Sequence, residues 1–263
     1  MTKTLIPAER RKRIRDYLAA HQVAHNAALS ELLEVSEATV RRDLEWLEGE
    51  GLVERTHGGA ALSQRLPTEP DYANSAQTRP MEKRAIGAVA AALVKDGETI
   101  FVNSGSTTSQ VIRHIRAANV TVITNNVSAA VEARRADFEL ILLGGAFRPR
   151  ANSVAGRFAL EMLRQVLAAK AFIGVDGLSL KYGFTTPTSD EAEIARLMIE
   201  RTRGEVIVVA DHSKWGVVSD FEIAPLERAQ TLVTDAGFDP DVRAELAAHK
   251  LDVVIANANH SEK

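Results

Sequence analysis

From residue 82 onward, short apolar runs typical of β-strands alternate with longer stretches of helical periodicity. The strand-like runs carry few polar residues at alternate positions, so both faces of these strands must be covered. Strands separated by helices indicate a mostly parallel α/β sheet with helices on either side. The expected strands are 99–103, 120–124, 138–145, 170–177, 205–211, 229–235 and 251–256, and the expected helices are 82–94, 108–118, 127–135, 156–168, 190–203 and 239–249.

The first 62 residues follow a different pattern, with helical segments at 8–20 and 27–34 and a third helix after Ser36, whose hydroxyl can cap it. The sequence of 51–62 predicts a β-hairpin that turns at Gly58 and Gly59. Helix, helix, turn, helix and hairpin is the order of a winged helix-turn-helix. The expected inward stripes are Ile14, Tyr17 and Leu18, then Leu29, Leu32 and Leu33, then Val40, Leu44 and Leu47.

Two neighbouring arginines, Arg41 and Arg42, lie in the third helix away from its apolar stripe. In a helix-turn-helix, the second helix of the pair lies in the DNA major groove, where an arginine fork fits guanine O6 and N7. Arg41 and Thr39 are expected in the groove, whereas Arg42 could instead hold a phosphate or pair with Asp43 or Glu45. The alternative is that both arginines are only exposed to solvent and contact no DNA. The expected DNA-binding residues are Ser36, Thr39, Arg41, Arg42, Arg55 and His57.

Net charge does not by itself predict a nucleic-acid partner. The whole chain has a formal charge of -3, and residues 1–62 hold nine basic and ten acidic side chains. DNA affinity must therefore come from where the charges are placed, and the basic residues concentrate in 10–15 and on the exposed side of 36–42.

Composition excludes several classes of protein. The chain has no cysteine, which excludes disulfides and thiolate metal sites. Neither a signal-peptide core nor an apolar run approaching the roughly 18 residues of a membrane span is found. The seven histidines show no spacing that suggests zinc. We expect a cytoplasmic protein without a membrane partner, a metal or a cofactor.

A segment rich in proline and small polar residues, 63–80, separates the two patterns and is expected to be a linker or an extended arm. The expected domains are therefore a winged helix-turn-helix at 1–62, this linker, and an effector-binding α/β domain at 81–263.

The ends of the expected strands carry the candidate ligand-binding residues. In open α/β sheets, ligands bind outside the carboxyl ends of strands, near helix N-termini. The sequence "NSGSTTSQ" (103–110) combines a tight glycine turn with hydroxyls at a helix start, which suits a phosphate. A plain helix cap is the alternative there and at Asp176. The expected effector-binding residues are Ser104, Gly105, Ser106, Thr107, Thr108, Asn125, Asn126, Gly145, Arg148, Asp176 and Lys214.

For two further patterns, the sequence favours a structural role over a functional one. Thr188 and Glu191 have the spacing of a helix capping box, which favours a structural role for that loop. Residues 211–213, "DHS", contain the residue types of a hydrolase triad, but neighbours in an extended stretch point to opposite sides and cannot form that relay with each other.

Several motifs, in order, resemble the DeoR family of transcriptional regulators. Arg10, Ile14 and Leu18, followed after seventeen residues by "SEATVRRDL", are similar to the DeoR helix-turn-helix signature, and "LVERTHGGAAL" is similar to its wing. In 80–256, "NSGSTT", "TNN", "LLGG", "FIGVDG" and "DHSKWG" resemble the sensor domain of that family. Asn103 stands where the family often has aspartate, and an amide cannot act as a base.

The resemblance implies a sensor similar in fold to ribose-5-phosphate isomerase and glucosamine-6-phosphate deaminase. It also implies a repressor of a carbohydrate operon that binds operator DNA and a phosphorylated sugar or sugar-alcohol effector, usually as a homodimer or homotetramer. The alternative is a sugar-phosphate isomerase or deaminase that carries a helix-turn-helix. No convincing base and acid pair can be assembled from the loops, so we expect a regulator and no enzyme.

Overall fold

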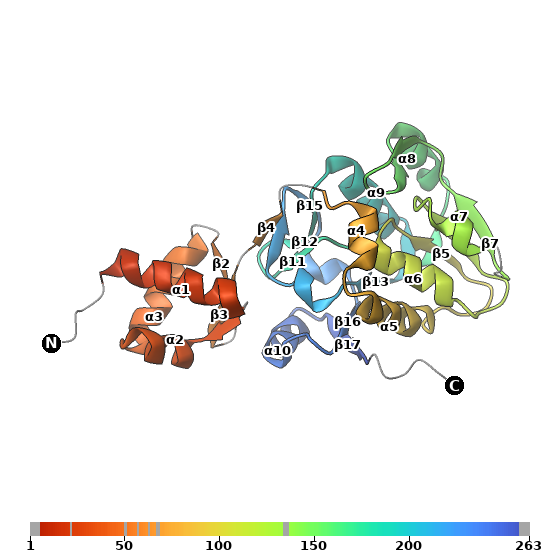
Figure 1. Cartoon of the computed structure of the whole chain (residues 1–263). Coiled ribbons are helices and arrows are strands. Elements are labelled where there is room, and N and C mark those ends of the chain that lie inside the picture. Colours follow the sequence, from red (N-terminus) through yellow and green to blue (C-terminus); the bar gives the residue numbers. More distant parts are fainter. Residues whose placement is uncertain are drawn as a thin grey trace.

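The computed structural model describes residues 6–21, 23–49, 52–56, 58–62, 64–66, 69–133 and 137–257. Figure 1 shows a helical N-terminal domain at one end, a larger sheet with its helices at the other, and β4 between them. Within the described residues, no helix is both long and apolar enough to cross a membrane.

The N-terminal domain has the predicted winged helix-turn-helix, with one strand that the sequence did not predict. Strand β1 pairs with β3 of the hairpin and completes a three-stranded sheet in the order β1-β3-β2. Leu32 was expected to point inward and is instead 43% exposed. The elements are α1 (Pro7–His21), β1 (Val23–His25), α2 (Asn26–Leu33), α3 (Glu37–Gly49), β2 (Val53–Thr56) and β3 (Gly59–Leu62).

The two glycines of the wing serve different purposes. Gly58 has a φ of +84°, a left-handed conformation that favours glycine. Gly59 is needed for space, because a Cβ atom there would lie 2.1 Å from the carbonyl oxygen of Ala24 in β1. Of these two glycines, Gly58 has the positive φ, whereas Gly59 is required for its small size because strand β1 packs directly against it.

The larger domain is built on the predicted parallel sheet. Its seven strands lie in the order β17-β16-β13-β10-β5-β6-β7, and every neighbouring pair is parallel. The mostly parallel α/β fold is confirmed. The strands are β5 (Thr99–Val102), β6 (Thr121–Thr124), β7 (Glu139–Leu142), β10 (Ala168–Gly174), β13 (Thr202–Val209), β16 (Thr231–Asp235) and β17 (Asp252–Ala256).

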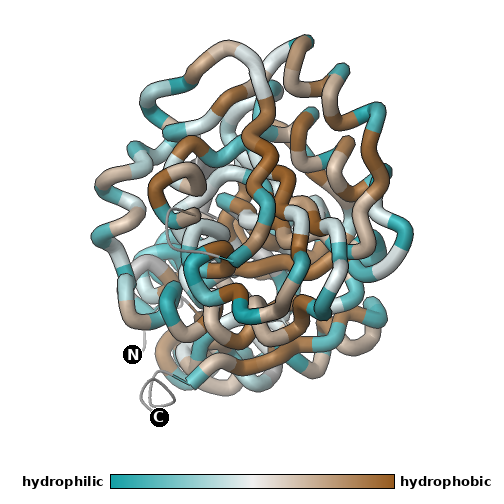
Figure 2. Tube along the Cα trace, turned by 90° about the vertical axis from the view of Figure 1, so that its right-hand side faces the viewer, coloured by the Kyte–Doolittle hydropathy of each residue, from teal (hydrophilic) through white to brown (hydrophobic). Residues whose placement is uncertain are grey.

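Helices cover both faces of this sheet, which explains the continuous apolar strands. Ile100 packs in one buried cluster, with α5 and α6, while the next residue, Phe101, packs in the other, with α8, α9 and α10. Figure 2 shows hydrophobic stretches of the chain running through the interior of the molecule. The helices are α5 (Pro80–Ala91), α6 (Ser106–His114), α7 (Ala129–Glu132), α8 (Arg157–Arg164), α9 (Ser189–Glu200) and α10 (Pro240–Ala248).

Short antiparallel strands lie at the carboxyl side of the sheet. They form a three-stranded sheet in the order β11-β12-β15 and a β8–β9 hairpin, and a single turn of 3-10 helix, η2, precedes β14. Their bounds are β8 (Ala146–Arg148), β9 (Ser153–Ala155), β11 (Gly177–Ser179), β12 (Gly183–Thr186), η2 (His212–Lys214), β14 (Val217–Ser219), β15 (Phe221–Ala224) and η3 (Leu226–Arg228).

The segment 63–80 connects the two domains, and parts of it also pack on the larger domain. Strand β4 (Gln64–Leu66) pairs in parallel with β14. Helix α4 (Tyr72–Gln77) begins at Asp71, whose side chain caps it, and contacts α6. We call residues 64–77 the arm.

Candidate functional site

The expected DNA-reading helix is α3, and its start has the predicted cap. The backbone amide of Thr39 donates to the Ser36 hydroxyl at 3.3 Å. Arg41 and Arg42 are both exposed. The Arg41 guanidinium lies 3.3 Å from the Glu37 carboxylate one turn earlier, an exposed pair that contributes little stability and leaves Arg41 able to turn toward a ligand.

Asp43, one of the two carboxylates expected to pair with Arg42, has other partners. Asp43 is 2% exposed and accepts from Arg10 Nε at 2.7 Å and from Arg11 Nε at 3.1 Å. Arg11 also stacks over the Trp46 ring, with 4.0 Å to its centroid. The first two arginines of the basic run therefore fasten α1 to α3. Lys12, Arg13 and Arg15 of that run are exposed.

The wing residue Arg55 turns toward α3. Its Nη1 donates to the backbone oxygen of Arg41 at 3.3 Å and lies 4.0 Å from the Glu45 carboxylate. Arg55 thus braces the candidate reading helix in this structure. His57, the other wing residue expected at DNA, lies outside the described residues.

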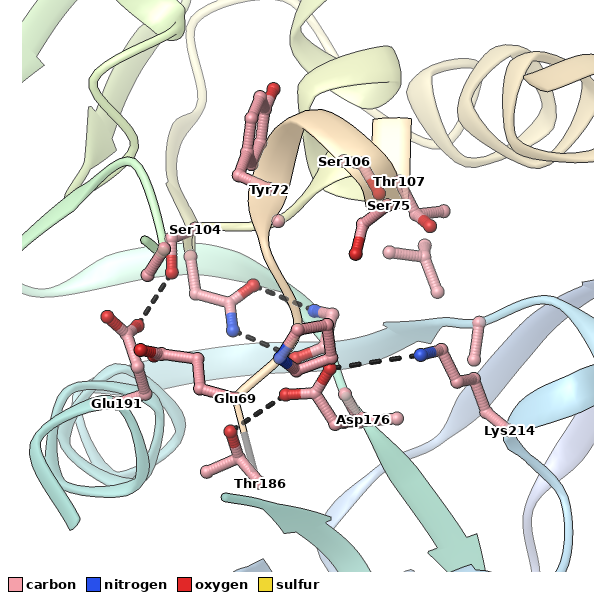
Figure 3. Close-up of a pocket in the computed structure, with 18 of the residues that line it drawn as sticks. Glu69, Tyr72, Ser75, Ser104, Ser106, Thr107, Asp176, Thr186, Glu191 and Lys214 are labelled. Atoms are coloured by element: carbon pink, nitrogen blue, oxygen red, sulfur yellow. Dashed lines mark hydrogen bonds and ion pairs between the residues drawn. The ribbon is translucent and has the colours of Figure 1, made fainter. Parts of the chain in front are cut away.

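A cavity of about 100 Å³ lies beyond the carboxyl ends of β5 and β10, where the strand-end residues were expected to meet (Figure 3). Six expected effector residues line it: Ser104, Gly105, Ser106, Thr107, Asp176 and Lys214. The other five, Thr108, Asn125, Asn126, Gly145 and Arg148, do not line it.

The first wall of this cavity is the start of α6. Gly105 precedes the helix with a φ of +145°, and no side chain caps the helix start. Thr108 is fully buried and its hydroxyl donates to the Gly105 carbonyl at 3.0 Å, so it supports the turn from behind. The side chains of Ser106 and Thr107 line the cavity.

The two asparagines after β6 hold the same turn in place. Asn125 accepts from the Ser104 amide at 2.7 Å, and Asn126 donates to the Gly105 carbonyl at 3.2 Å. Both asparagines are fully buried. They affect the cavity indirectly, because they fix the backbone turn that forms its first wall.

The opposite wall carries an ion pair. Lys214 Nζ lies 3.8 Å from Asp176 Oδ1, and the Thr186 hydroxyl donates to Asp176 Oδ2 at 2.9 Å (Figure 3). A carboxylate oxygen that faces a cavity can accept from sugar hydroxyls, and an ammonium beside it can bind an anion.

Gly145 and Arg148 lie on the rim hairpin β8–β9. A Cβ atom at Gly145 would lie 2.5 Å from the Ala155 carbonyl oxygen, so this glycine permits the close approach of the two strands. Arg148 lies behind two residues that line the cavity. It holds both oxygens of Glu69 at 2.8 and 2.9 Å and lies 3.4 Å from Glu191.

The capping-box prediction for α9 is wrong. Thr188 makes no side-chain cap hydrogen bond and accepts instead from Arg148. Glu191 reaches into the cavity wall, where Ser104 Oγ donates to it at 2.6 Å and Ser153 Oγ also donates. The spacing was correct for a capping box, but hydroxyls of serines from distant loops donate to the carboxylate instead.

Sequence reasoning also missed Lys83 and the arm. Lys83 is 5% exposed, lines the cavity and donates from Nζ to the Ser75 carbonyl. Burial lowers the pKa of Lys83, while the neighbouring Asp211 carboxylate opposes that shift. The arm lines the cavity with Glu69, Pro70, Tyr72 and Ser75. No signal in a segment of small polar residues predicts such a role.

Asn103 uses both halves of its amide. Its Nδ2 donates to the Gly174 carbonyl at 2.9 Å, and its Oδ1 accepts from the Gly174 amide at 2.7 Å. An aspartate could not make both bonds when ionised, because a carboxylate only accepts. The asparagine therefore ties the end of β5 to the end of β10.

The "DHS" residues do not form a relay with one another, as predicted. Ser213 donates to Asp211, which caps η2. His212 Nδ1 lies 2.7 Å from Asp235 Oδ2, and the His212 amide donates to Asp235 Oδ1 at 2.8 Å. Among the described residues, no group of three or more histidines and carboxylates could hold a metal ion.

Comparison with known proteins gives matches for both domains. Residues 10–65 match the DeoR-like helix-turn-helix domain, and residues 78–236 match the DeoR C terminal sensor domain. The HTH-type transcriptional regulator GlpR of Haloferax volcanii is 34% identical over 95% of this chain and 98% of its own length. The HTH-type transcriptional repressor GlcR of Bacillus subtilis is 34% identical over 86% of this chain and 88% of its own.

A solved structure overlaps about half of this chain. Ribose 5-phosphate isomerase A from Methanocaldococcus jannaschii is 20% identical, with a TM-score of 0.37 over 51% of this chain and 53% of that chain. This overlap is too slight to carry an argument about function.

Proposed function

The chain belongs to the DeoR family of helix-turn-helix regulators, and on that premise we propose that it represses a carbohydrate-metabolism operon under the control of a phosphorylated sugar or sugar alcohol. In this proposal residues 1–62 bind operator DNA, residues 81–263 bind the effector, and 63–80 connect them. A coupling free energy of about 1–3 kcal/mol between the two sites would suffice for regulation and must be reciprocal.

The observation that carries the effector half is the cavity at the uncapped start of α6. The first amides of a helix lack intrahelical partners and carry partial positive charge, which suits a phosphate. The hydroxyls of Ser106 and Thr107 lie beside them, and Lys83 and Lys214 add cationic charge to the same cavity. Asp176 is placed to accept from sugar hydroxyls.

The DNA half rests on α3. Its exposed arginines, Arg41 and Arg42, would meet base edges and phosphates, with Ser36 and Thr39 at the helix start. Arg55 would support the helix, and His57 remains a candidate phosphate contact. A single reading helix per chain favours a homodimer, or a homotetramer, on repeated half-sites. Such a regulator would act in the cytoplasm, where its DNA lies.

We further propose that the chain is not an enzyme. The support comes from the relatives, which carry the names of transcriptional regulators, and from Asn103, whose amide joins two strands and cannot act as a base. Incubation with ribose 5-phosphate and glucosamine 6-phosphate should give no turnover. Conversion of either compound would favour the alternative, an isomerase or deaminase fused to a helix-turn-helix.

The direct experiment is a thermal-shift screen of sugar phosphates, each paired with its unphosphorylated sugar. A ligand at about 100 times its dissociation constant stabilises the folded protein by roughly 2.7 kcal/mol. The phosphorylated member should stabilise the protein and the free sugar should not, because the α6 amides and the lysines recognise the phosphate. Equal stabilisation by both members would contradict a phosphate site.

A further inference from the structure

The effector cavity is closed on one side by the arm that leads to the DNA-binding domain. Glu69, Pro70, Tyr72 and Ser75 form this wall, and Figure 3 shows Glu69, Tyr72 and Ser75 around the space. The cavity measures about 100 Å³, whereas small-molecule sites usually measure about 300–1,000 Å³. A wall must therefore move before a sugar phosphate can enter.

The wall is held by one ion pair and several hydrogen bonds. Arg148 grips both carboxylate oxygens of Glu69, and the two side chains are 17% and 15% exposed. The backbone around this pair is also tied down, since Arg150 donates to the Glu69 carbonyl at 2.6 Å and the Tyr72 amide donates to the Arg150 carbonyl at 2.8 Å. Among the contacts of this wall that the described residues make, Glu69–Arg148 is the one that joins opposite charges, so it is the contact for which another anion can compete.

The charges around the cavity make an entering anion compete strongly with the Glu69 carboxylate. Three carboxylates line it, those of Glu69, Asp176 and Glu191, against the two ammonium groups of Lys83 and Lys214. A phosphate dianion added to this set would be repelled by all three carboxylates at short range. Burial raises the pKa of Glu69, and the nearby Glu191 and Asp176 carboxylates raise it further against the pull of Arg148.

We propose that Glu69 is an internal anion that closes the effector cavity by pairing with Arg148, and that an anionic effector breaks this pair and opens the arm. This inference rests on the proposed phosphate site at α6. When Glu69 swings out, the cavity gains volume, loses one negative charge and exposes Arg148 to offset the charge of the ligand.

The position of Glu69 in the chain gives the opening a route to DNA. Strand β4 lies just before Glu69 and follows the wing strand β3. Its partner β14 begins three residues after Lys214, another residue of the cavity. Strand β4 and Glu69 thus join the arm to the sensor at two places close to the effector site, and we expect the closed arm to favour the DNA-binding arrangement.

The test compares wild type with Glu69→Gln, which keeps the shape of the side chain and removes its charge. Inorganic phosphate and ribose 5-phosphate are titrated by calorimetry, with ribose as the neutral probe. Glu69→Gln should bind both anions roughly tenfold more tightly, within the 5- to 150-fold range typical of coupled sites, and should bind ribose no better. It should also hold a duplex selected by the wild-type protein several-fold more weakly without effector.

The matched control is Glu193→Gln, which removes one exposed carboxylate from α9, two residues from Glu191. This control should match wild type in both measurements. Unchanged anion affinity in Glu69→Gln, or an equal gain for ribose, would overturn the internal-anion role while leaving the phosphate site standing. A wild-type protein that does not distinguish ribose 5-phosphate or any other sugar phosphate from its free sugar would instead overturn the proposed function itself.

Discussion

Asp43 fastens α1 to α3, and Asp43→Ala tests how the winged domain is held together. Its carboxylate is 2% exposed and lies 2.7 Å from Arg10 Nε and 3.1 Å from Arg11 Nε. Removing one partner of a buried ion pair generally costs about 3–5 kcal/mol, because the remaining charge is left uncompensated. Arg10 and Arg11 are 12% and 24% exposed, so water can partly solvate them. We therefore expect the lower end of that range, about 3 kcal/mol.

The assay is chemical denaturation of the full chain followed by fluorescence of Trp46, which lies in α3 beside Arg11. A Trp215→Phe background removes the second of the two tryptophans. Asp16→Ala, which removes an exposed carboxylate from α1, is the control and should change stability by less than about 0.5 kcal/mol. If Asp43→Ala behaves like this control, the two arginines do not depend on Asp43 and the reasoning is refuted.

Four further variants have expected outcomes. Arg41→Ala should cost about 1–3 kcal/mol on the specific site, whereas Arg42→Ala should weaken specific and random duplex alike and reduce the salt slope by about one, measured by fluorescence anisotropy at several salt concentrations. Gly105→Val should abolish the effector response and leave DNA binding intact, because valine is strained at a φ of +145°, and a variant that still releases DNA would contradict this. Burial favours a higher pKa for Asp235, but hydrogen bonds from His212 outweigh it and hold that pKa below its ordinary 3.8. The stabilisation from this carboxylate is therefore present above about pH 4 and is lost as the pH falls through the lowered pKa of Asp235 in the folded state. Asp235→Asn should therefore make the free energy of unfolding depend less on pH in the acid range.

Some functional features could be predicted from residues that lie close together in the sequence. The cap at Ser36 depends on residues three apart, and the left-handed turn at Gly58 depends on its own backbone. The glycine and hydroxyls of 104–107 follow a strand and open a helix, and parallel topology brings strand ends to one edge. Their place at the cavity could therefore be predicted.

Other features depended on partners far along the chain. The pattern of Thr188 and Glu191 fits a capping box, yet Glu191 binds Ser104, 87 residues away. Gly59 requires its small size because β1 passes beside it. A carboxylate or a glycine has several local uses, and only the neighbours supplied by the fold select among them.

The sequence by itself determined the main helices of both domains, the wing hairpin and the strands of the parallel sheet, since apolar periodicity follows directly from which faces are buried. It also determined that hydroxyls and amides gather at the strand ends. Only the tertiary structure decided which charges meet: Arg10 with Asp43 across 33 residues, and Arg148 with Glu69 across 79. Electrostatic pairing has no period along the chain, because its strength depends on distance and burial in space and not on spacing in sequence.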